Sequence, residues 1–321
     1  MIGMYAHHAG SGHLHRVRAI QKHLQDDSVV FSSTPGADII LPDDTEPIRA
    51  SARDETANDT VHWAPIGVPG HTERLAIIAE WIATHHPSVF YVDCSVDIAI
   101  FVRLMGIPVV TIAMPGFRHD RPHQVSYLQA DAIIAAWPDW VPVPASLIGY
   151  ENKIHTVGGI SRFEDEAGEA MGESLPHAGD TGENVIILRG AGGDDFDKYQ
   201  WPPATVLGGD ARVENPMPYL RSASAVIAAA GQNSVADLAV ARAPAVIFPQ
   251  ERPFGEQDAT AQHLDRVGLA VVLRDFPDPG QWPQLFEEAR KRAANWHLWQ
   301  VEGAAARAAQ VIESVAARYR R

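Results

Sequence analysis

The feature that most constrains the fold is a strand, glycine turn, helix, strand pattern in the second half of the chain. An apolar run from Ala223 to Ala230 is followed by Gly231, a helical pattern over 234–241 and a second apolar run over 245–248. This order is typical of a parallel α/β sheet, in which the turn after a strand opens at the carboxyl edge and the next helix offers free N–H groups to an anion. Gly231 lets the backbone approach a bound group closely. The pattern therefore predicts a ligand site at this turn.

A second pattern of the same kind begins the chain. An apolar stretch over 1–6 predicts a strand, Gly10 and Gly12 make a tight turn, and apolar residues at helical spacing predict a helix over 14–24. The segment G-x-G-H-x-x-R departs from the dinucleotide fingerprint G-x-G-x-x-G, because His15 stands where the third glycine belongs. The departure argues against a nicotinamide oxidoreductase.

Composition limits the partners of the chain. Its 321 residues suffice for two ordinary domains, and the net charge of −14 argues against nucleic acid as a partner and allows at most peripheral membrane contact. The lone Cys94 excludes a disulfide framework, and no apolar run is long enough to span a bilayer, so we expect a cytoplasmic location. The 15 histidines are scattered without an H-E-x-x-H motif. We therefore expect no metal site. We also expect no cofactor.

Two groups of polar residues near the second turn are candidates for ligand binding, each with a structural alternative. Asp237 lies one helical turn beyond Gly231 and can accept from both hydroxyls of a ribose, but Ser234 and Asp237 also form an S-x-x-D capping box. Glu256 and Gln257 follow the next strand, and their alternative is a solvated helix start.

A known family shares this arrangement. The donor-binding region of GT-B glycosyltransferases resembles a set of residues in this chain, namely Gly231-Gln-Asn-Ser-Val-Ala-Asp237, Pro244, Pro249 and Glu256-Gln257. The chain departs from the nucleoside-diphosphosugar signature at Ala229, where that signature has a histidine. The branch that holds the peptidoglycan N-acetylglucosaminyltransferase, family 28, manages without it, so we favour that branch.

The resemblance implies a role for each matching residue in the second half. Asn233 and Ser234 would face the diphosphate, Asp237 the ribose, and Glu256 and Gln257 the hydroxyls of the sugar. The list of residues expected around the diphosphate is completed by Gly231, by Arg162 in a G-x-x-x-R segment, and by Gly192 in a glycine loop after the strand over 185–188.

The N-terminal turn is similar to the acceptor-side loop of the same proteins, and the resemblance implies that Gly10 and Gly12 belong to the substrate-binding residues. There a histidine after the glycines is a candidate general base, a role that falls on His13, with His7, His8 and His15 as weaker alternatives. Asp93, at the end of a predicted strand, either orients His13 or caps a turn. The loop over 114–123 carries two further candidates for contact with acceptor or phosphate, Arg118 and Arg121.

The fold class that follows is α/β, of GT-B type, with two Rossmann-like domains facing a cleft and a C-terminal helix that crosses back to the first domain. The expected segments are an acceptor-side domain over 1–160, a flexible linker over 161–184, a donor-binding domain over 185–295 and the returning helix over 296–321. The expected function is inverting, metal-independent transfer of a sugar from a nucleotide-diphosphate donor, a UDP-sugar in first place, to an unknown acceptor. A nucleotide-sugar hydrolase and a non-catalytic nucleotide-sugar-binding protein are the alternatives.

Overall fold

The computed structural model describes residues 1–45, 54–166, 184–190 and 198–320, which form two compact units. Unit 1 comprises Met1–Ala136, Val143–Val157 and Ala305–Arg321, and unit 2 comprises Trp137–Pro142 and Gly158–Ala304. Gly192 and residues 167–183 of the predicted linker lie outside the described residues. Among the described helices, none has both the length and the apolar character that a membrane span requires.

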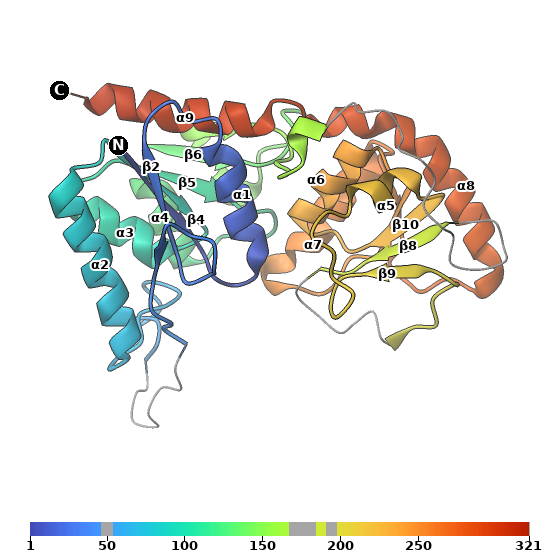
Figure 1. Cartoon of the computed structure of the whole chain (residues 1–321), viewed down its shortest axis with the longest axis horizontal. Coiled ribbons are helices and arrows are strands. Elements are labelled where there is room, and N and C mark those ends of the chain that lie inside the picture. The colour runs from blue at the N-terminus through green and yellow to red at the C-terminus, as the bar shows by residue number, and fades with distance from the viewer. Residues whose placement is uncertain (46–53, 167–183, 191–197, 321) are drawn as a thin grey trace. The chain divides into compact units, whose positions relative to one another are not determined.

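Unit 1 is built on a parallel sheet of seven strands in the order β3-β2-β1-β4-β5-β6-β7 (Figure 1). The strands are β1 Ile2–Ala6, β2 Ser28–Ser32, β3 Ile39–Ile40, β4 Val89–Asp93, β5 Val109–Ala113, β6 Ala132–Ala135 and β7 Ile154–Thr156. The helices are α1 Ser11–Gln21, α2 Pro69–His85, α3 Val96–Leu104, α4 Arg121–Gln129 and α9 Ala304–Tyr319. β1, β4 and β5 are buried along their whole length, as expected when helices cover both faces of a parallel sheet.

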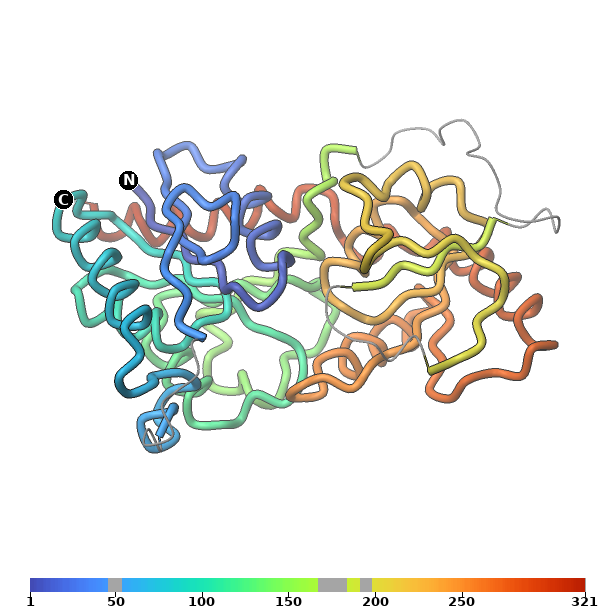
Figure 2. Tube along the Cα trace, turned by 60° about the horizontal axis from the view of Figure 1, so that its bottom comes forward, coloured from blue at the N-terminus to red at the C-terminus, as the bar shows by residue number. Residues whose placement is uncertain are grey.

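The last helix, α9, lies along unit 1, and its final turn lies near the N-terminus in both views of the chain trace (Figures 1 and 2). Arg307 on α9 donates to the carbonyl oxygen of Val157, and Tyr319 donates its hydroxyl to Asp131. Glu313 accepts from the backbone N–H of Gln25. These bonds join the end of the chain to its first 157 residues.

Unit 2 contains a parallel sheet of five strands in the order β12-β11-β10-β8-β9. The strands are β8 Val185–Leu188, β9 Thr205–Leu207, β10 Ala225–Ala228, β11 Ala245–Ile247 and β12 Val271–Val272. The α-helices are α5 Met217–Ser222, α6 Gln232–Ala241, α7 Glu256–Arg266 and α8 Trp282–Arg292, and a 3-10 helix spans Ala293–Trp299.

Successive residues of β10 contribute to opposite faces of this sheet. Val226 and Ala228 belong to an apolar cluster with Val235 and Leu238 of α6, whereas Ile227 belongs to a second cluster that contains residues of α8. This alternation follows from the two-residue period of a strand. Both faces of the sheet are therefore buried, and ligands can reach the sheet only at its edges.

The strand orders fix where those sites lie. In unit 1 the chain moves outward from β1 in one direction through β2 and β3, and in the other from β4 to β7, so the topology switches between β1 and β4. In unit 2 the corresponding switch lies between β8 and β10. Open α/β sheets bind ligands at the carboxyl ends of the strands beside such a switch. Both glycine turns predicted from the sequence lie at these positions.

Candidate functional site

In unit 1, the turn after β1 presents His13 at the carboxyl edge of the sheet. Helix α1 begins at Ser11, three residues before the predicted start at 14, with Gly10 as its N-cap residue. Gly10 has φ 87° and ψ 154°, a conformation that essentially only glycine adopts. The glycine thus turns the chain sharply into the helix, and His13 lies in the first helical turn rather than in the preceding loop.

Asp93 is the centre of the polar contacts around His13. It ends β4, the strand paired with β1, and its side chain is fully buried. Oδ1 lies 2.7 Å from Nδ1 of His13, and Arg16 donates from Nε to Oδ2 at 2.7 Å and from Nη2 to Oδ1 at 2.8 Å. Tyr91 donates its hydroxyl to Oδ2 at 3.0 Å. Of the two roles considered for Asp93, the structure places it against His13, while the following helix is capped by Ser95, which accepts from the N–H of Ile98.

Charge pairing keeps Asp93 ionised despite its burial. Burial by itself would raise the pKa of this carboxyl, but the guanidinium of Arg16 and the bond from His13 hold the pKa well below its usual range. An ionised Asp93 accepts the Nδ1–H of His13 and fixes the tautomer in which Nε2 is the free base. His13 remains partly accessible, with 16% of its side chain exposed. The arrangement can therefore remove a proton from a hydroxyl group or from water.

The backbone next to Asp93 is strained. Cys94 has φ 67°, a left-handed backbone conformation that residues other than glycine rarely adopt. A strained backbone conformation persists only where the surrounding structure holds it in place, and such residues are often found at functional sites.

A second polar cluster lies beside His13. His7 and His8 stack with ring centroids 4.7 Å apart, and His7 lies edge-on to His13 at 5.7 Å. Burial and the two neighbouring imidazoles lower the pKa of His7 to about 4, so this side chain is neutral at physiological pH. His8 approaches the buried Asp44 at 3.8 Å. His7 and His8 thus line the same turn as His13, although neither contacts a carboxylate as closely.

The two arginines predicted to contact the acceptor occupy different environments. Arg118 is buried and donates from Nε to the carbonyl oxygen of Pro115 at 3.2 Å. Arg121 is exposed and is the first residue of α4, a helix that starts four residues before the predicted start at 125. Pro122 accounts for the earlier start, since proline fits the first turn of a helix. Of the two, Arg121 is the one whose side chain is presented to solvent.

In unit 2, the turn after β10 leads directly into α6. Gly231 is the N-cap residue with φ −67°, so its conformation does not demand glycine, and an added Cβ would lie 3.9 Å from Oγ of Ser234. Asn233 and Ser234 lie in the first turn of α6 and are partly exposed. A helix N-terminus of this kind, with small residues around it, suits a phosphate group.

Asp237 does not cap this helix. Helix α6 begins at Gln232, the N-cap residue is Gly231, and no side chain makes a capping bond there. Asp237 instead accepts a hydrogen bond of 2.6 Å from the hydroxyl of Ser161. Burial raises the pKa of Asp237 to about 6, although the bond from Ser161 and the charge of Arg162 oppose this shift. The capping alternative is thus excluded by the geometry.

Arg162 lies in the same neighbourhood as Asp237. It donates from Nη2 to the carbonyl oxygen of Glu214 and stacks over the ring of Phe163 with its guanidinium carbon 4.5 Å from the centroid. Burial lowers its pKa, and the nearby carboxylate of Asp237 opposes that change. Unit 2 therefore combines a carboxylate and an arginine close to the predicted diphosphate position.

Glu256 and Gln257 begin α7, as the sequence pattern suggested. The side chain of Gln257 is buried, and its Oε1 accepts from the backbone N–H groups of Ala230 at 3.1 Å and Gln250 at 2.9 Å. These bonds tie the segment after β10 to the segment after β11. A contact between Gln257 and a sugar would have to use its amide nitrogen.

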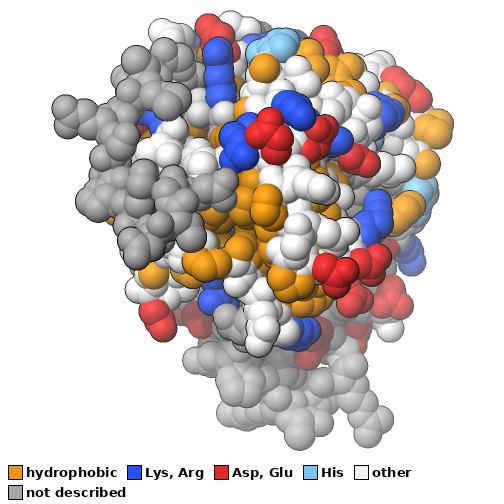
Figure 3. Space-filling model, turned by 90° about the vertical axis from the view of Figure 1, so that its right-hand side faces the viewer, with side chains coloured by type: hydrophobic (Ala, Val, Ile, Leu, Met, Phe, Trp, Pro, Cys, Tyr) orange, Lys and Arg blue, Asp and Glu red, His pale blue; other side chains and the backbone are white. Residues whose placement is uncertain are grey.

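A cavity of about 420 Å³ elsewhere on unit 2 is not part of this site. It is lined by apolar side chains that include Val185, Trp201, Trp282 and Phe286, and Figure 3 shows apolar side chains gathered on the side of unit 2 that carries α8. Val185 is the first residue of β8, so the cavity lies toward the amino end of that strand. Ligands of open α/β sheets bind at the opposite end.

Several residues of these sites were not singled out by the sequence. Ser161, which bonds to Asp237, occupies a position that the G-x-x-x-R motif leaves unspecified. Tyr91, which bonds to Asp93, belongs to no recognisable motif. Arg16, by contrast, is the final residue of the G-x-G-H-x-x-R segment, and its spacing of one helical turn from His13 was a usable signal.

The two sheets, each with a glycine turn at its topological switch, define a protein of the GT-B class, as the sequence predicted. Solved structures have the same fold over nearly the whole chain. The glycotransferase of kitacinnamycin aligns with a TM-score of 0.65 and 14% identity over 98% of both chains. The spinosyn forosaminyltransferase SpnP gives 0.65 and 13% over 98% of this chain and 99% of its own, and Acinetobacter baumannii MurG gives 0.57 and 18% over the same shares.

The second half of the chain is similar to one family within this class. Residues 158–278 match the glycosyltransferase family 28 C-terminal domain, so the resemblance to a family 28-like GT-B protein is confirmed. A curated relative from Synechococcus sp. (strain CC9902), named UDP-N-acetylglucosamine--N-acetylmuramyl-(pentapeptide) pyrophosphoryl-undecaprenol N-acetylglucosamine transferase, is 28% identical over 181 residues. That match covers 55% of this chain and 46% of the relative, so the chain spans about half the length of the curated relative.

Proposed function

We propose that this protein is a glycosyltransferase that moves a sugar from a nucleoside-diphosphate donor, a UDP-sugar in first place, to an acceptor hydroxyl. The observation that carries the proposal is the pair formed by His13 and the buried Asp93 at the switch point of unit 1. The family match of residues 158–278 supports it from the other half of the chain. The curated relative names a UDP-sugar, and one structural neighbour was solved with thymidine diphosphate and another with a UDP-sugar analogue.

In the proposed reaction, Nε2 of His13 removes the proton of the acceptor hydroxyl while Asp93 holds the imidazole in place. The acceptor oxygen bonds to the anomeric carbon, the bond from that carbon to the diphosphate breaks, and the nucleoside diphosphate leaves with the electron pair. Attack from the face opposite the leaving group inverts the anomeric centre. The departing charge is received by the N-terminus of α6 and by Arg162, and no step requires a metal ion.

In unit 2, Asp237 is proposed to accept hydrogen bonds from the ribose hydroxyls of the donor. Asn233 and Ser234 lie at the start of α6, where N–H groups favour phosphate. Glu256 is proposed to bind a hydroxyl of the transferred sugar. We further propose a cytoplasmic location, for which the lone cysteine is the support.

The test uses the purified full chain. UDP-, GDP- and dTDP-sugars are first compared in a thermal-shift assay, because a ligand that binds the folded state raises its melting temperature. Release of nucleoside diphosphate is then measured with and without a panel of hydroxyl acceptors. We expect one nucleotide class to raise the melting temperature, and release to depend on an acceptor and on His13.

Other outcomes would separate the alternatives. Equal release with and without every acceptor would indicate a hydrolase, in which His13 activates water. Binding without release would indicate a nucleotide-sugar-binding protein. Failure of all three nucleotide classes to bind would overturn the proposal. His23→Ala, which changes a histidine just after α1, is the matched control for His13→Ala.

A further inference from the structure

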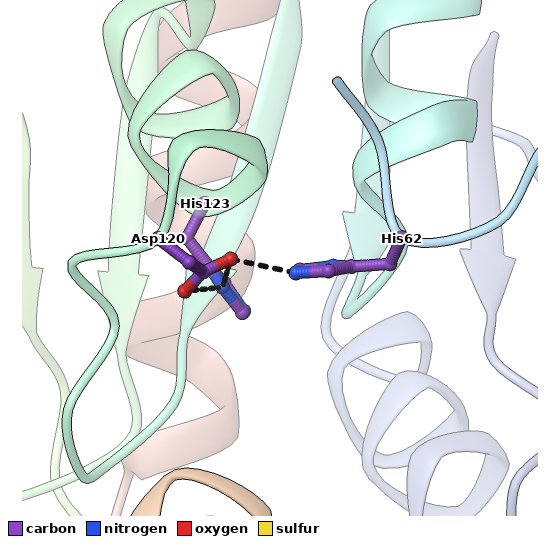
Figure 4. Close-up of side chains that lie close together, drawn as sticks. All are labelled: His62, Asp120 and His123. Atoms are coloured by element: carbon purple, nitrogen blue, oxygen red, sulfur yellow. Dashed lines mark hydrogen bonds and ion pairs between the residues drawn. The ribbon is translucent and has the colours of Figure 1, made fainter. Parts of the chain in front are cut away.

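Unit 1 contains a group of metal-ligating side chains that the proposed transfer does not use. His62, Asp120 and His123 point toward one another, as Figure 4 shows, and their ligand atoms all lie within 4.8 Å of one another. Nε2 of His62 lies 2.7 Å from Oδ2 of Asp120, and Nδ1 of His123 lies 2.7 and 2.8 Å from the two carboxylate oxygens. The two imidazole rings have centroids 4.4 Å apart.

The position of Asp120 in its helix sets this carboxylate apart. Asp120 is the N-cap residue of α4, where an aspartate usually accepts from the first N–H groups of the helix and contributes about 1 kcal/mol. No side-chain capping bond is made here, and both oxygens face imidazoles instead. The carboxylate of Asp120 therefore bonds to the two histidines and does not cap the helix.

The cluster joins segments far apart in the chain. Asp120 and His123 are one helical turn apart at the start of α4, whereas His62 comes from the segment between β3 and α2 and is separated from Asp120 by 58 residues. A local motif search cannot find such a set, and for that reason the sequence predicted no metal. The side chains of His62, Asp120 and His123 are 38%, 30% and 10% exposed, so the group is open to solvent on one side and anchored on the other.

The spacing of the ligand atoms is close to that of a tetrahedral metal centre. Zinc bonds of 2.0–2.1 Å place tetrahedral ligand atoms about 3.3 Å apart. Without an ion, hydrogen bonds hold Asp120 at 2.7 Å from each of the two histidines, so these two pairs must separate by about 0.6 Å. The nitrogen atoms of His62 and His123 already lie within 4.8 Å of each other. Small side-chain rotations supply such changes. The cation would replace the hydrogens that these pairs share.

We propose that His62, Asp120 and His123 bind one divalent transition-metal cation of the zinc class, with a fourth coordination position open to water or another oxygen ligand. Two imidazole nitrogens favour zinc, cobalt or nickel over magnesium and calcium, which prefer oxygen ligands. A bound cation would fasten the segment around His62 to the start of α4. It takes no part in the proton removal assigned to His13.

The contact between Arg118 and His123 allows an independent test of the proposed metal site. Its Nη1 lies 3.4 Å from Nε2 of His123, so in the absence of metal Nε2 accepts from the guanidinium and Nδ1 carries the hydrogen. When Nδ1 binds a cation, the hydrogen must reside on Nε2, and the bond from Arg118 is lost. The positive charge of Arg118 also opposes the cation. Arg118→Met should therefore strengthen metal binding.

The experiment uses the tag-free full chain after removal of metals with a chelator. Co²⁺ is titrated alone and followed by its visible absorption, and Zn²⁺ is then added in competition. We expect one Co²⁺ per chain, displaced by Zn²⁺, and a loss of affinity of at least about 10-fold in His62→Ala and in His123→Ala. His119→Ala, which removes an exposed histidine from the same segment, is the matched control and should bind as the unchanged protein does.

Because His62 is exposed and lies outside helices and strands, His62→Ala is the variant least expected to disturb folding. The proposal is overturned if the unchanged protein binds no more Co²⁺ than His62→Ala, if His119→Ala loses affinity equally, or if Mg²⁺ binds in preference to Zn²⁺. Weaker metal binding in a folded Arg118→Met protein would also contradict it. No nucleotide sugar is present in these titrations, so their outcome is independent of the proposed transfer.

Discussion

Replacing Asp237 with asparagine tests whether its carboxylate binds the donor or has only a structural role. Burial raises the pKa of Asp237 from 3.8 to about 6, so the folded protein holds a proton there that the unfolded chain has released. The stability of the native protein should therefore fall as the pH rises from about 4 to about 6, because in that window the folded state binds more protons. Asparagine keeps the shape and still accepts from Ser161, but it carries no charge.

The size of the effect follows from that shift. A difference of about two pKa units corresponds to at most about 3 kcal/mol, since one unit is about 1.4 kcal/mol. Asp237→Asn should thus stabilise the protein at pH 7 by about 1–3 kcal/mol, and the gain should vanish near pH 4. For a unit of this size, each kcal/mol shifts the melting temperature by about 2–4 °C.

The same substitution should remove donor binding. In the unchanged protein, the ionised fraction of a carboxyl with a pKa of about 6 rises from about one tenth at pH 5 to about nine tenths at pH 7. If ribose hydroxyls bind the ionised form, donor affinity should increase about tenfold over this range. A nucleotide sugar is the proper ligand for the titration, because it lacks the terminal phosphate that itself ionises near pH 6.

Melting temperatures are measured from pH 4 to pH 8 for the unchanged protein, Asp237→Asn and Asp265→Asn. Asp265 is a largely exposed aspartate near the end of α7, and its substitution is the control for replacing an aspartate with asparagine elsewhere in unit 2. Loss of stability in Asp237→Asn at pH 7, with an unaltered pH profile, would refute the assignment of a raised pKa. A stabilised variant that still binds the donor with full affinity would refute the ligand role and leave the carboxyl of Asp237 with a purely structural role.

The remaining predictions concern unit 1. His13→Ala should lower the transfer rate by a factor of about 10²–10⁴ while donor binding, followed by thermal shift, stays the same; loss of donor binding instead would contradict its role as a base. Asp93→Ala should destabilise the protein by about 3–5 kcal/mol because it leaves the buried Arg16 without its carboxylate, and a melting temperature close to that of the unchanged protein would refute this. Gly10→Ala should cost about 1–3 kcal/mol through backbone strain alone, since no atom lies within 4 Å of the added Cβ. Gly190 also has no atom within 4 Å of an added Cβ but has no positive φ, so Gly190→Ala should melt close to the unchanged protein. An equal loss of stability in the Gly10→Ala and Gly190→Ala variants would show that backbone strain is not the cause.

Local patterns in the sequence predicted parallel α/β sheets, and the resemblance to GT-B proteins supplied their arrangement in two domains. Apolar runs gave the strands, and glycines between a run and a helical pattern marked the turns, because burial on both faces of a parallel sheet demands continuous apolar stretches. The edges of elements were less accurate. α1 begins at Ser11 and α4 at Arg121, each three or four residues before the predicted start, since Gly10 and Pro122 act through backbone geometry rather than apolar periodicity.

The partners of the functional side chains were decided by the tertiary structure. Asp93 meets His13 across 80 residues, Ser161 meets Asp237 across 76, and His62 meets Asp120 across 58. Periodicity describes what a residue does within its own element, and it carries no information about which distant element lies alongside. Strand order brings the carboxyl ends of β1 and β4 together, and this arrangement places the imidazole of His13 against the carboxylate of Asp93.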